Sequence, residues 1–123
     1  MVIDTSVLVA VFFDEKHADW ALAQLEAHAG ALRMSTVNLT ELVILIRDRQ
    51  PQLADEIEDA ILGSGIRFVP PDVDHARIAA AARLRFPLNP GDCFAYALAS
   101  AEGCGILTLD AGFRHVDVPV TLP

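Results

Sequence analysis

The chain has 123 residues, of which 53% are hydrophobic, and a formal net charge of −8. This length suits one domain over residues 1–123 with an ordinary core, and the apolar content excludes a disordered chain. No apolar stretch reaches the length of a transmembrane helix, and the start Met1–Asp4 lacks the basic region of a signal peptide. We therefore expect no membrane segment. The negative charge argues against broad coating of nucleic acid but not against a nuclease, whose metal ions supply positive charge locally.

Cysteine and histidine do not indicate a metal site of their own. Cys93 and Cys104 lack CxxC spacing, and the histidines at positions 17, 28, 75 and 115 form no HxxxH pair. Both patterns argue against zinc. Two thiols in a chain without a secretion signal indicate a reduced setting, and we expect the protein to be cytoplasmic.

Strand and helix patterns alternate along the chain. Short apolar strands are predicted at 2–4, 32–35, 66–69, 106–109 and 118–122. Helices are predicted at 6–13, 17–28, from Thr36 or Asn38 to 49, from Pro51 to 62, from Asp72 or Asp74 to 85, and at 91–102. This alternation predicts an α/β fold, a three-layer sandwich with a mostly parallel sheet of four to five strands covered by helices on both faces.

Four carboxylates lie where these predicted elements begin or end. Asp4 and Asp110 close strands, whereas Glu41 and Asp92 lie in the first turns of helices. In an open α/β sheet, strand C-termini and the helix N-termini that follow them meet at one crevice. Four carboxylates there repel one another unless a cation lies between them, and such oxygen-rich sites suit Mg²⁺ or Mn²⁺.

Each acid also has a purely structural interpretation. Asp4 or its neighbouring hydroxyls could cap the next helix, Asp92 could cap its own helix, and Asp110 could be a turn residue. Glu41 could form a capping box with Asn38. The convergence of all four on one edge is harder to attribute to caps, because two of them follow strands.

The apolar run Leu42–Ile46 after Glu41 indicates a largely buried helix. A buried carboxylate needs a partner, and no lysine or arginine lies within the preceding turn, so a metal ion is a candidate partner for Glu41. The same run is apolar at consecutive positions, which one sheet face cannot cover. Either neighbouring helices or a second copy of the chain would cover the remainder.

Two other phosphate-handling families begin with an aspartate at the end of a strand. A haloacid-dehalogenase-type phosphatase needs a second aspartate two residues further on, where this chain has Ser6. A receiver domain needs paired acids after its first strand and a late lysine, whereas the only lysine here is Lys16. Neither pattern fits.

The chain instead resembles the PIN-domain ribonucleases, and among them the VapC-type toxins of bacterial toxin–antitoxin pairs. The resemblance spans the whole chain. It rests on Asp4-Thr5-Ser6, the stretch from Ser35 to Glu41, the segment Asn89-Pro90-Gly91-Asp92-Cys93-Phe94-Ala95-Tyr96-Ala97-Leu98-Ala99, and Leu107-Thr108-Leu109-Asp110.

The resemblance implies an endoribonuclease that depends on Mg²⁺ or Mn²⁺, acts on an RNA substrate, forms a homodimer and is inhibited by a cognate antitoxin protein. It places Asp4, Glu41, Asp92 and Asp110 as catalytic acids and metal ligands, with Ser6, Asn38 and Thr108 in support. Metal-activated water would attack the phosphodiester. The helix N-termini would keep Glu41 and Asp92 ionised, and nearby Arg83, Arg85 and Arg114 are candidates for RNA contact.

Two departures from the family pattern bear on activity. Gly112-Phe113 stands where many relatives have Asp-Phe, so Asp110 would serve alone in its loop, and the segment Arg85–Leu88 before the Asn89–Asp92 motif is short. A non-catalytic alternative is a PIN-like module kept for dimerisation or antitoxin binding. The retention of all four acids argues against that alternative.

Overall fold

A computed structural model describes all 123 residues and has a five-stranded sheet at its centre. The strands are β1 (Val2–Ile3), β2 (Arg33–Ser35), β3 (Arg67–Val69), β4 (Ile106–Leu107) and β5 (Val120–Thr121). Their order is β3-β2-β1-β4-β5 and all four pairings are parallel. All strand C-termini therefore lie at one edge of the sheet, as a site built on strand ends requires.

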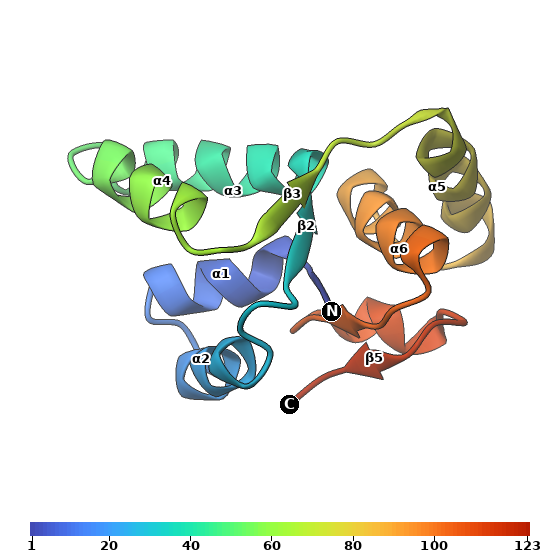
Figure 1. Ribbon diagram of the computed structural model, residues 1–123, viewed down its shortest axis with the longest axis horizontal. Coiled ribbons are helices and arrows are strands. Elements are labelled where there is room, and N and C mark those ends of the chain that lie inside the picture. Colours follow the sequence, from blue (N-terminus) through green and yellow to red (C-terminus); the bar gives the residue numbers. More distant parts are fainter.

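Helices cover both faces of this sheet (Figure 1). They are α1 (Thr5–Phe12), α2 (Ala18–Ala27), α3 (Thr36–Arg49), α4 (Ala54–Leu62), α5 (Val73–Arg85) and α6 (Pro90–Glu102), with a short 3₁₀ helix η1 (Ala111–His115) after β4. Helices α1 to α4 lie on one side of the strands and α5 and α6 on the other (Figure 1). The predicted three-layer α/β fold with a parallel sheet is confirmed.

The sheet separates two apolar cores because successive residues of a strand face opposite sides. Ile3 and Leu107 join the core under α1 to α4, whereas Val2 and Ile106 join the core under α5 and α6. The second core is built largely on α6, which is buried on most sides, as its composition predicts. None of the six helices combines the length and apolar character needed to cross a bilayer.

The start of α3 differs from the sequence prediction. Ser35, rather than Thr36 or Asn38, is the N-cap, and its hydroxyl accepts a hydrogen bond from the Val37 N–H at 3.2 Å. Glu41 is consequently the sixth residue of the helix and lies in its second turn, so its prediction as a first-turn residue was wrong. The prediction failed because β2 runs directly into α3, with no loop to mark the boundary.

Two other helix starts are now defined. Helix α4 begins at Ala54, and Pro51 lies in the preceding turn rather than in the helix. Asp72 is the cap of α5, where it forms a capping box with His75. The first of the two residues considered for this cap is therefore confirmed.

Candidate active site

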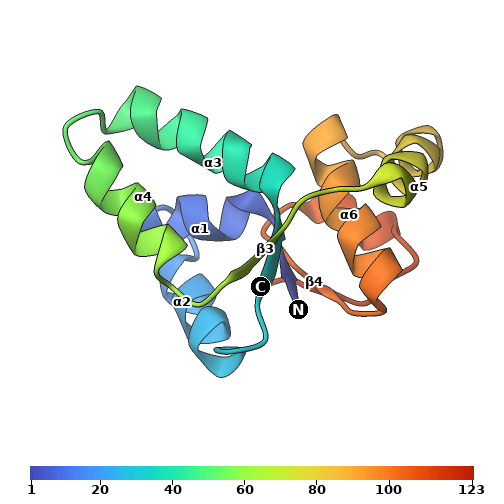
Figure 2. The same cartoon turned by 45° about the horizontal axis from the view of Figure 1, so that its top comes forward.

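The four acids come from four elements that meet at the C-terminal edge of the sheet. Asp4 follows β1, Asp110 follows β4, and Glu41 and Asp92 come from the N-terminal parts of α3 and α6. The two helix starts lie close together (Figure 2) and are joined by the Asn38 side-chain N–H, which donates to the Gly91 carbonyl at 3.0 Å. The convergence predicted from the sequence is present.

Asp4 is both a helix cap and a buried site residue, with only 3% of its surface exposed. Its Oδ2 accepts hydrogen bonds from the Ser6 hydroxyl at 2.7 Å, the Thr108 hydroxyl at 3.0 Å and the Ser6 backbone N–H at 3.4 Å. The capping and metal-site interpretations are thus compatible at this residue.

Two hydroxyls join the end of β1 to the segment that follows β4. The Ser6 hydroxyl oxygen accepts the Leu109 N–H at 3.0 Å, and that of Thr108 accepts the Asp110 N–H at 2.9 Å. Because both hydroxyls also donate to Asp4, they hold the Asp4 carboxylate and the backbone before Asp110 in one network. Ser6 and Thr108 therefore lie where supporting residues were predicted.

Glu41 has protein partners that the sequence did not reveal. Its Oε1 accepts from the Asn38 side-chain N–H at 2.9 Å and from the Thr5 hydroxyl at 3.2 Å. These two donors partner Oε1 in the absence of a nearby lysine or arginine, and a metal ion as a further partner of Glu41 stays a prediction. Thr5 is 36 residues away in sequence, and no local pattern indicates such a contact.

Asp92 and Asp110 each combine a local backbone role with a place at the site. Asp92 forms a capping box with Asn89, through the Asp92 N–H to Asn89 Oδ1 at 2.8 Å and the Asn89 N–H to Asp92 Oδ2 at 3.2 Å. Asp110 is exposed and caps η1 by accepting the Gly112 N–H on Oδ1 at 2.8 Å.

One oxygen of each acid is held, and the other makes no hydrogen bond within the protein. The held oxygens are Asp4 Oδ2, Glu41 Oε1, Asp92 Oδ2 and Asp110 Oδ1. The only fully buried side-chain polar atom without a partner is Asn38 Oδ1. The second oxygen of each acid is therefore open to solvent or a ligand, on a carboxylate whose orientation is already set.

Crowding changes the acidity of the two buried acids. Burial, followed by the negative charges of Asp4, Asp110 and Glu41, raises the pKa of Asp92 to about 7, although the hydrogen bond from Asn89 opposes the shift. Burial raises the pKa of Asp4 as well, against the hydrogen bonds from Ser6 and Thr108 and with a smaller contribution from Glu41. The expectation that a helix N-terminus keeps Asp92 ionised was wrong, because desolvation and like charges outweigh the helix dipole.

The donor set fits a hard divalent cation that keeps part of its water shell. All donors are carboxylate oxygens, supported by hydroxyls, and no histidine or cysteine forms part of the site. No group of three or more Asp, Glu, His or Cys side chains is arranged closely enough to hold a metal ion by direct contact alone. Mg²⁺ typically binds through one or two carboxylates and several waters, which agrees with this open arrangement.

The three arginines predicted to contact RNA differ in their surroundings. Arg85 donates to Asp117 at 3.3 Å and lies over the Phe86 ring, with Cζ 4.7 Å from its centre. Arg83 and Arg114 are exposed and make no ion pair. These two have free guanidinium groups, whereas Arg85 is already paired.

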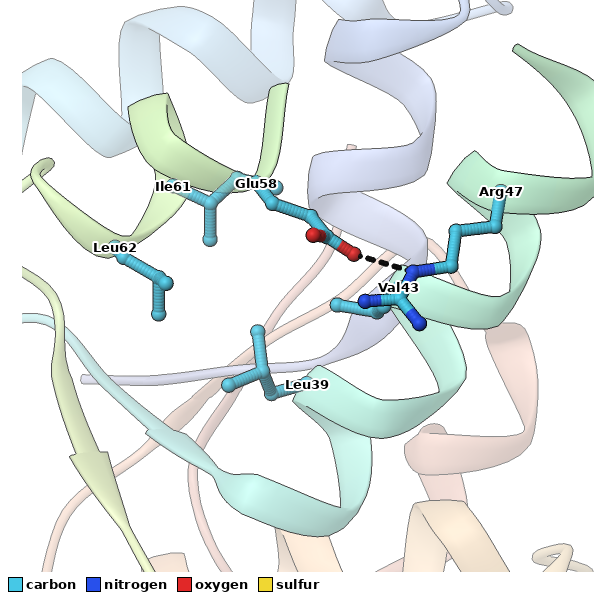
Figure 3. A pocket seen from close by; sticks show the side chains of 6 residues that line it. All are labelled: Leu39, Val43, Arg47, Glu58, Ile61 and Leu62. Carbon is cyan, nitrogen blue, oxygen red and sulfur yellow. Dashed lines mark hydrogen bonds and ion pairs between the residues drawn. The ribbon is translucent and has the colours of Figure 1, made fainter. Parts of the chain in front are cut away.

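A second surface feature is an apolar groove between α3 and α4, shown in Figure 3. It is lined by Leu39 and Val43 from α3 and by Ile61 and Leu62 from α4. The Arg47 Nε donates to Glu58 Oε1 at 2.7 Å and so links the two helices beside the groove. We call this feature the α3–α4 groove.

Comparison with known proteins places these features in a family. The sequence profile described as "PIN domain" matches residues 1–119. The protein named "VapC ribonuclease Mb0640" from Mycobacterium bovis is 36% identical over 132 aligned positions, which cover 100% of both chains.

Solved structures with the same fold are more distant in sequence. The crystal structure of Mycobacterium tuberculosis VapC20, described as a "Sarcin-Ricin loop cleaving toxin", superposes with a TM-score of 0.84 at 19% identity and covers 99% of this chain and 98% of that chain. A chain of a toxin–antitoxin complex from Klebsiella pneumoniae gives a TM-score of 0.80 at 21% identity and covers 98% and 95%.

Proposed function

This chain belongs to the PIN-domain family, and we propose that it is a divalent-metal-dependent endoribonuclease that acts as the toxin of a toxin–antitoxin pair. The observation that carries the proposal is the set of four converging acids, each with one oxygen held by the protein and one oxygen free. The name of the M. bovis relative as a ribonuclease supports the same activity.

Asp4 and Asp92 are the acids best placed to hold Mg²⁺ or Mn²⁺, since both are buried and repel each other when ionised. When bound, the ion supplies Lewis acidity and a water of lowered pKa. Ser6 and Thr108 orient Asp4 by donating to its Oδ2, which leaves Oδ1 for a ligand. Glu41 and Asp110 add two further negative charges at this edge of the sheet. The exposed guanidinium groups of Arg83 and Arg114 are available to bind phosphate oxygens of RNA.

Cleavage of total RNA tests the enzymatic proposal. We expect cleavage with Mg²⁺ or Mn²⁺ and none with EDTA, and sequencing of the new 5′ ends would identify the cleavage site. Titration with Mn²⁺ in the absence of RNA separates the enzyme from a non-catalytic PIN-like module. A chain that neither binds Mn²⁺ nor cleaves RNA would support the non-catalytic alternative.

The partner in this proposal is an antitoxin whose amphipathic helix occupies the α3–α4 groove. Apolar Leu39, Val43, Ile61 and Leu62 suit the apolar face of such a helix. The groove begins one turn from the start of α3, so a segment beyond the helix could reach the acids with an arginine or lysine and replace the charge of the cation. The toxin–antitoxin composition of the K. pneumoniae neighbour supports an antitoxin as the partner.

Growth assays test the partner. The wild-type chain alone should arrest growth, and co-expression with the neighbouring gene should relieve the arrest. Leu62→Glu should weaken antitoxin binding and leave RNA cleavage intact, because Leu62 is 59% exposed at the groove. The matched control is Leu84→Glu on α5, where the side chain is 90% exposed on the other side of the sheet. Equal effects of the two variants would contradict docking in the groove.

We also propose a homodimer that works in the cytoplasm. Leu42 and Ile46 are buried by neighbouring helices, but Ile44 on the same helix remains 61% exposed. A second chain would cover it, as the resemblance to VapC-type toxins implies. Sedimentation should show a dimer at micromolar concentration that Ile44→Asp weakens. A wild-type monomer at that concentration would contradict the dimer.

A further inference from the structure

The carboxylate of Glu41 lies directly against the backbone of α6 at Gly91. A Cβ atom placed on Gly91 would lie 2.5 Å from Cδ and Oε1 of Glu41 and closer still to Oε2. All three atoms of the carboxylate therefore occupy the space that any other residue at position 91 would fill. The close approach depends on the absence of a side chain there.

The backbone conformation at Gly91 does not itself require glycine. The glycines with positive φ are Gly30, Gly65 and Gly103, whereas Gly91 lies in the first turn of α6. Alanine is a better helix former than glycine at an ordinary helical conformation. The local preference of α6 thus favours alanine, and the reason for glycine lies in the contact with Glu41.

Asn38 binds both partners of this contact. Its side-chain nitrogen donates to Glu41 Oε1 at 2.9 Å and to the Gly91 carbonyl at 3.0 Å. Both partners are acceptors, so only the amide nitrogen can face them. The Asn38 Oδ1 is buried and accepts no hydrogen bond. The amide orientation therefore satisfies Glu41 and Gly91 and leaves one of its own polar atoms without a partner.

Thr5 holds the same carboxylate from α1. Its single hydroxyl proton is shared between the Asn38 carbonyl oxygen at 3.1 Å and Glu41 Oε1 at 3.2 Å. Thr5 immediately follows Asp4, so this contact connects the position of Glu41 to the buried acid at the end of β1. Two donors and one steric boundary therefore determine where the free Oε2 of Glu41 lies.

We propose that Gly91 is a positioning residue for the reaction, which acts by leaving space for Glu41 beside α6, with Thr5 as a second positioning residue. The proposal rests on the proposed nuclease function. A side chain at position 91 would push the carboxylate of Glu41 toward solvent and away from Asp4 and Asp92. The flexible Glu41 side chain can make this movement without disturbing the helix, so the fold should persist while the site is lost.

A cycle of Gly91→Ala, Glu41→Asp and the double variant tests this proposal in the full chain. Gly91→Ala should still fold and unfold cooperatively, weaken Mn²⁺ binding by about tenfold or more and lower kcat for RNA by about 10²-fold. Glu41→Asp should also lower both quantities. In the Glu41→Asp background, the shorter side chain is already withdrawn from α6, so adding Gly91→Ala should have little further effect.

The matched control is Gly63→Ala at the end of α4, where φ is −89° and the nearest atom to a new Cβ is the Asp59 carbonyl oxygen at 3.2 Å. It should leave Mn²⁺ binding and cleavage unchanged. Wild-type Mn²⁺ affinity in folded Gly91→Ala would overturn the proposal, as would equal losses from Gly91→Ala in both backgrounds. Mn²⁺ titration keeps this test separate from the nuclease proposal, because it needs no RNA.

The Thr5 variants test the second positioning residue independently of whether Gly91→Ala folds. Thr5→Val removes the hydroxyl at nearly constant volume, and Thr5→Ser retains it. We expect Thr5→Val to weaken Mn²⁺ binding and lower kcat more than KM changes, and Thr5→Ser to retain more of both properties. Identical behaviour of the two variants would show that Thr5 only fills space and would overturn the positioning of Glu41 from α1.

Discussion

Helices α6 and α3 each deliver one acid to the site, but they do so by different means. In α6, Asp92 is held by a capping box with Asn89, three residues earlier in the chain. In α3, Glu41 lies a full turn further into the helix and is held by Thr5 and Asn38, while Asn38 also binds Gly91 of α6. One acid is thus placed by local backbone geometry and the other by contacts between elements.

This difference determines how the placement of each acid affects the stability of the protein. The capping box on α6 contributes to the stability of the helix whether or not a cation binds. The arrangement around Glu41 instead leaves a buried amide oxygen without a donor and requires a glycine in a helix. Such features persist at functional sites, where local rules are broken for the sake of geometry.

The largest expected effect is that of Asp92→Asn on cleavage. Asparagine can keep the capping box through its oxygen, so the fold should survive, but the proposed cation would lose a charged ligand. We expect cleavage to fall by roughly three orders of magnitude, as suits the loss of several kcal/mol of transition-state stabilisation. Cleavage and melting temperature should be measured together, with exposed Asp74→Asn on α5 as the control. Folded Asp92→Asn with wild-type cleavage would contradict the proposed function.

Asn38→Ala should destabilise the protein more than a typical surface change. It removes the shared donor of Glu41 and Gly91 at a fully buried position, and we expect a loss of about 2–3 kcal/mol in the free energy of unfolding. Urea denaturation measures this loss, with exposed Asp48→Ala on the same helix as the control. Mn²⁺ affinity should fall in parallel. Unchanged Mn²⁺ affinity would show that the contacts around Glu41 serve stability alone.

Metal-free protein should lose stability as the pH rises. The pKa of Asp92 is raised to about 7 and that of Asp4 is also raised, so the folded state binds more protons than the unfolded state between the normal aspartate range and about pH 7. Stability is therefore greatest below this window and falls as pH increases through it. With EDTA, the melting temperature should drop by about 3–6 °C from pH 5 to pH 7.5.

Two comparisons sharpen the pH experiment. Asp92→Asn should flatten the slope, and saturating Mg²⁺ should remove most of it, because the cation replaces the proton. The pKa values of Asp72, Glu102 and Asp117 are lowered by their hydrogen bonds, and these groups lose their contribution only at lower pH. If the melting temperature of the metal-free protein rises from pH 5 to pH 7.5, the raised pKa values of Asp4 and Asp92 would be contradicted.

The sequence predicted α6 better than α3, and the reason is physical. Asn89, Pro90 and Asp92 form a helix start within four residues, and hydrophobic periodicity and cap residues report such local features. At α3, the absence of a loop after β2 concealed the cap Ser35, and Glu41 was placed a turn too early. Alternation of strands and helices was sufficient to predict the parallel three-layer fold and the convergence of the acids on one edge.

Contacts between distant segments could not be predicted in the same way. Thr5 and Glu41 are separated by 36 residues, and Asn38 and Gly91 by 53, and one sequence carries no signal for such pairs. The raised pKa of Asp92 was also missed, because it depends on burial and on three other acids rather than on its place in a helix. The assigned roles of the four acids, of Ser6, Asn38 and Thr108, and of the arginines remain predictions.

The smallest effects should come from the two helix caps, and they distinguish the two helices most directly. Asn89→Ala and Ser35→Ala each remove one side-chain acceptor at an N-cap and should each cost about 1 kcal/mol in the free energy of unfolding.

Only Asn89→Ala should weaken Mn²⁺ binding, because Asp92 belongs to the same capping box. Ser35 lies more than one turn before Glu41, whose carboxylate is held independently by Thr5 and Asn38. Urea denaturation checks the first expectation and Mn²⁺ titration the second. An equal loss of Mn²⁺ affinity in both variants would mean that α3 also places its acid through the helix start, and the distinction between local and long-range placement would fail.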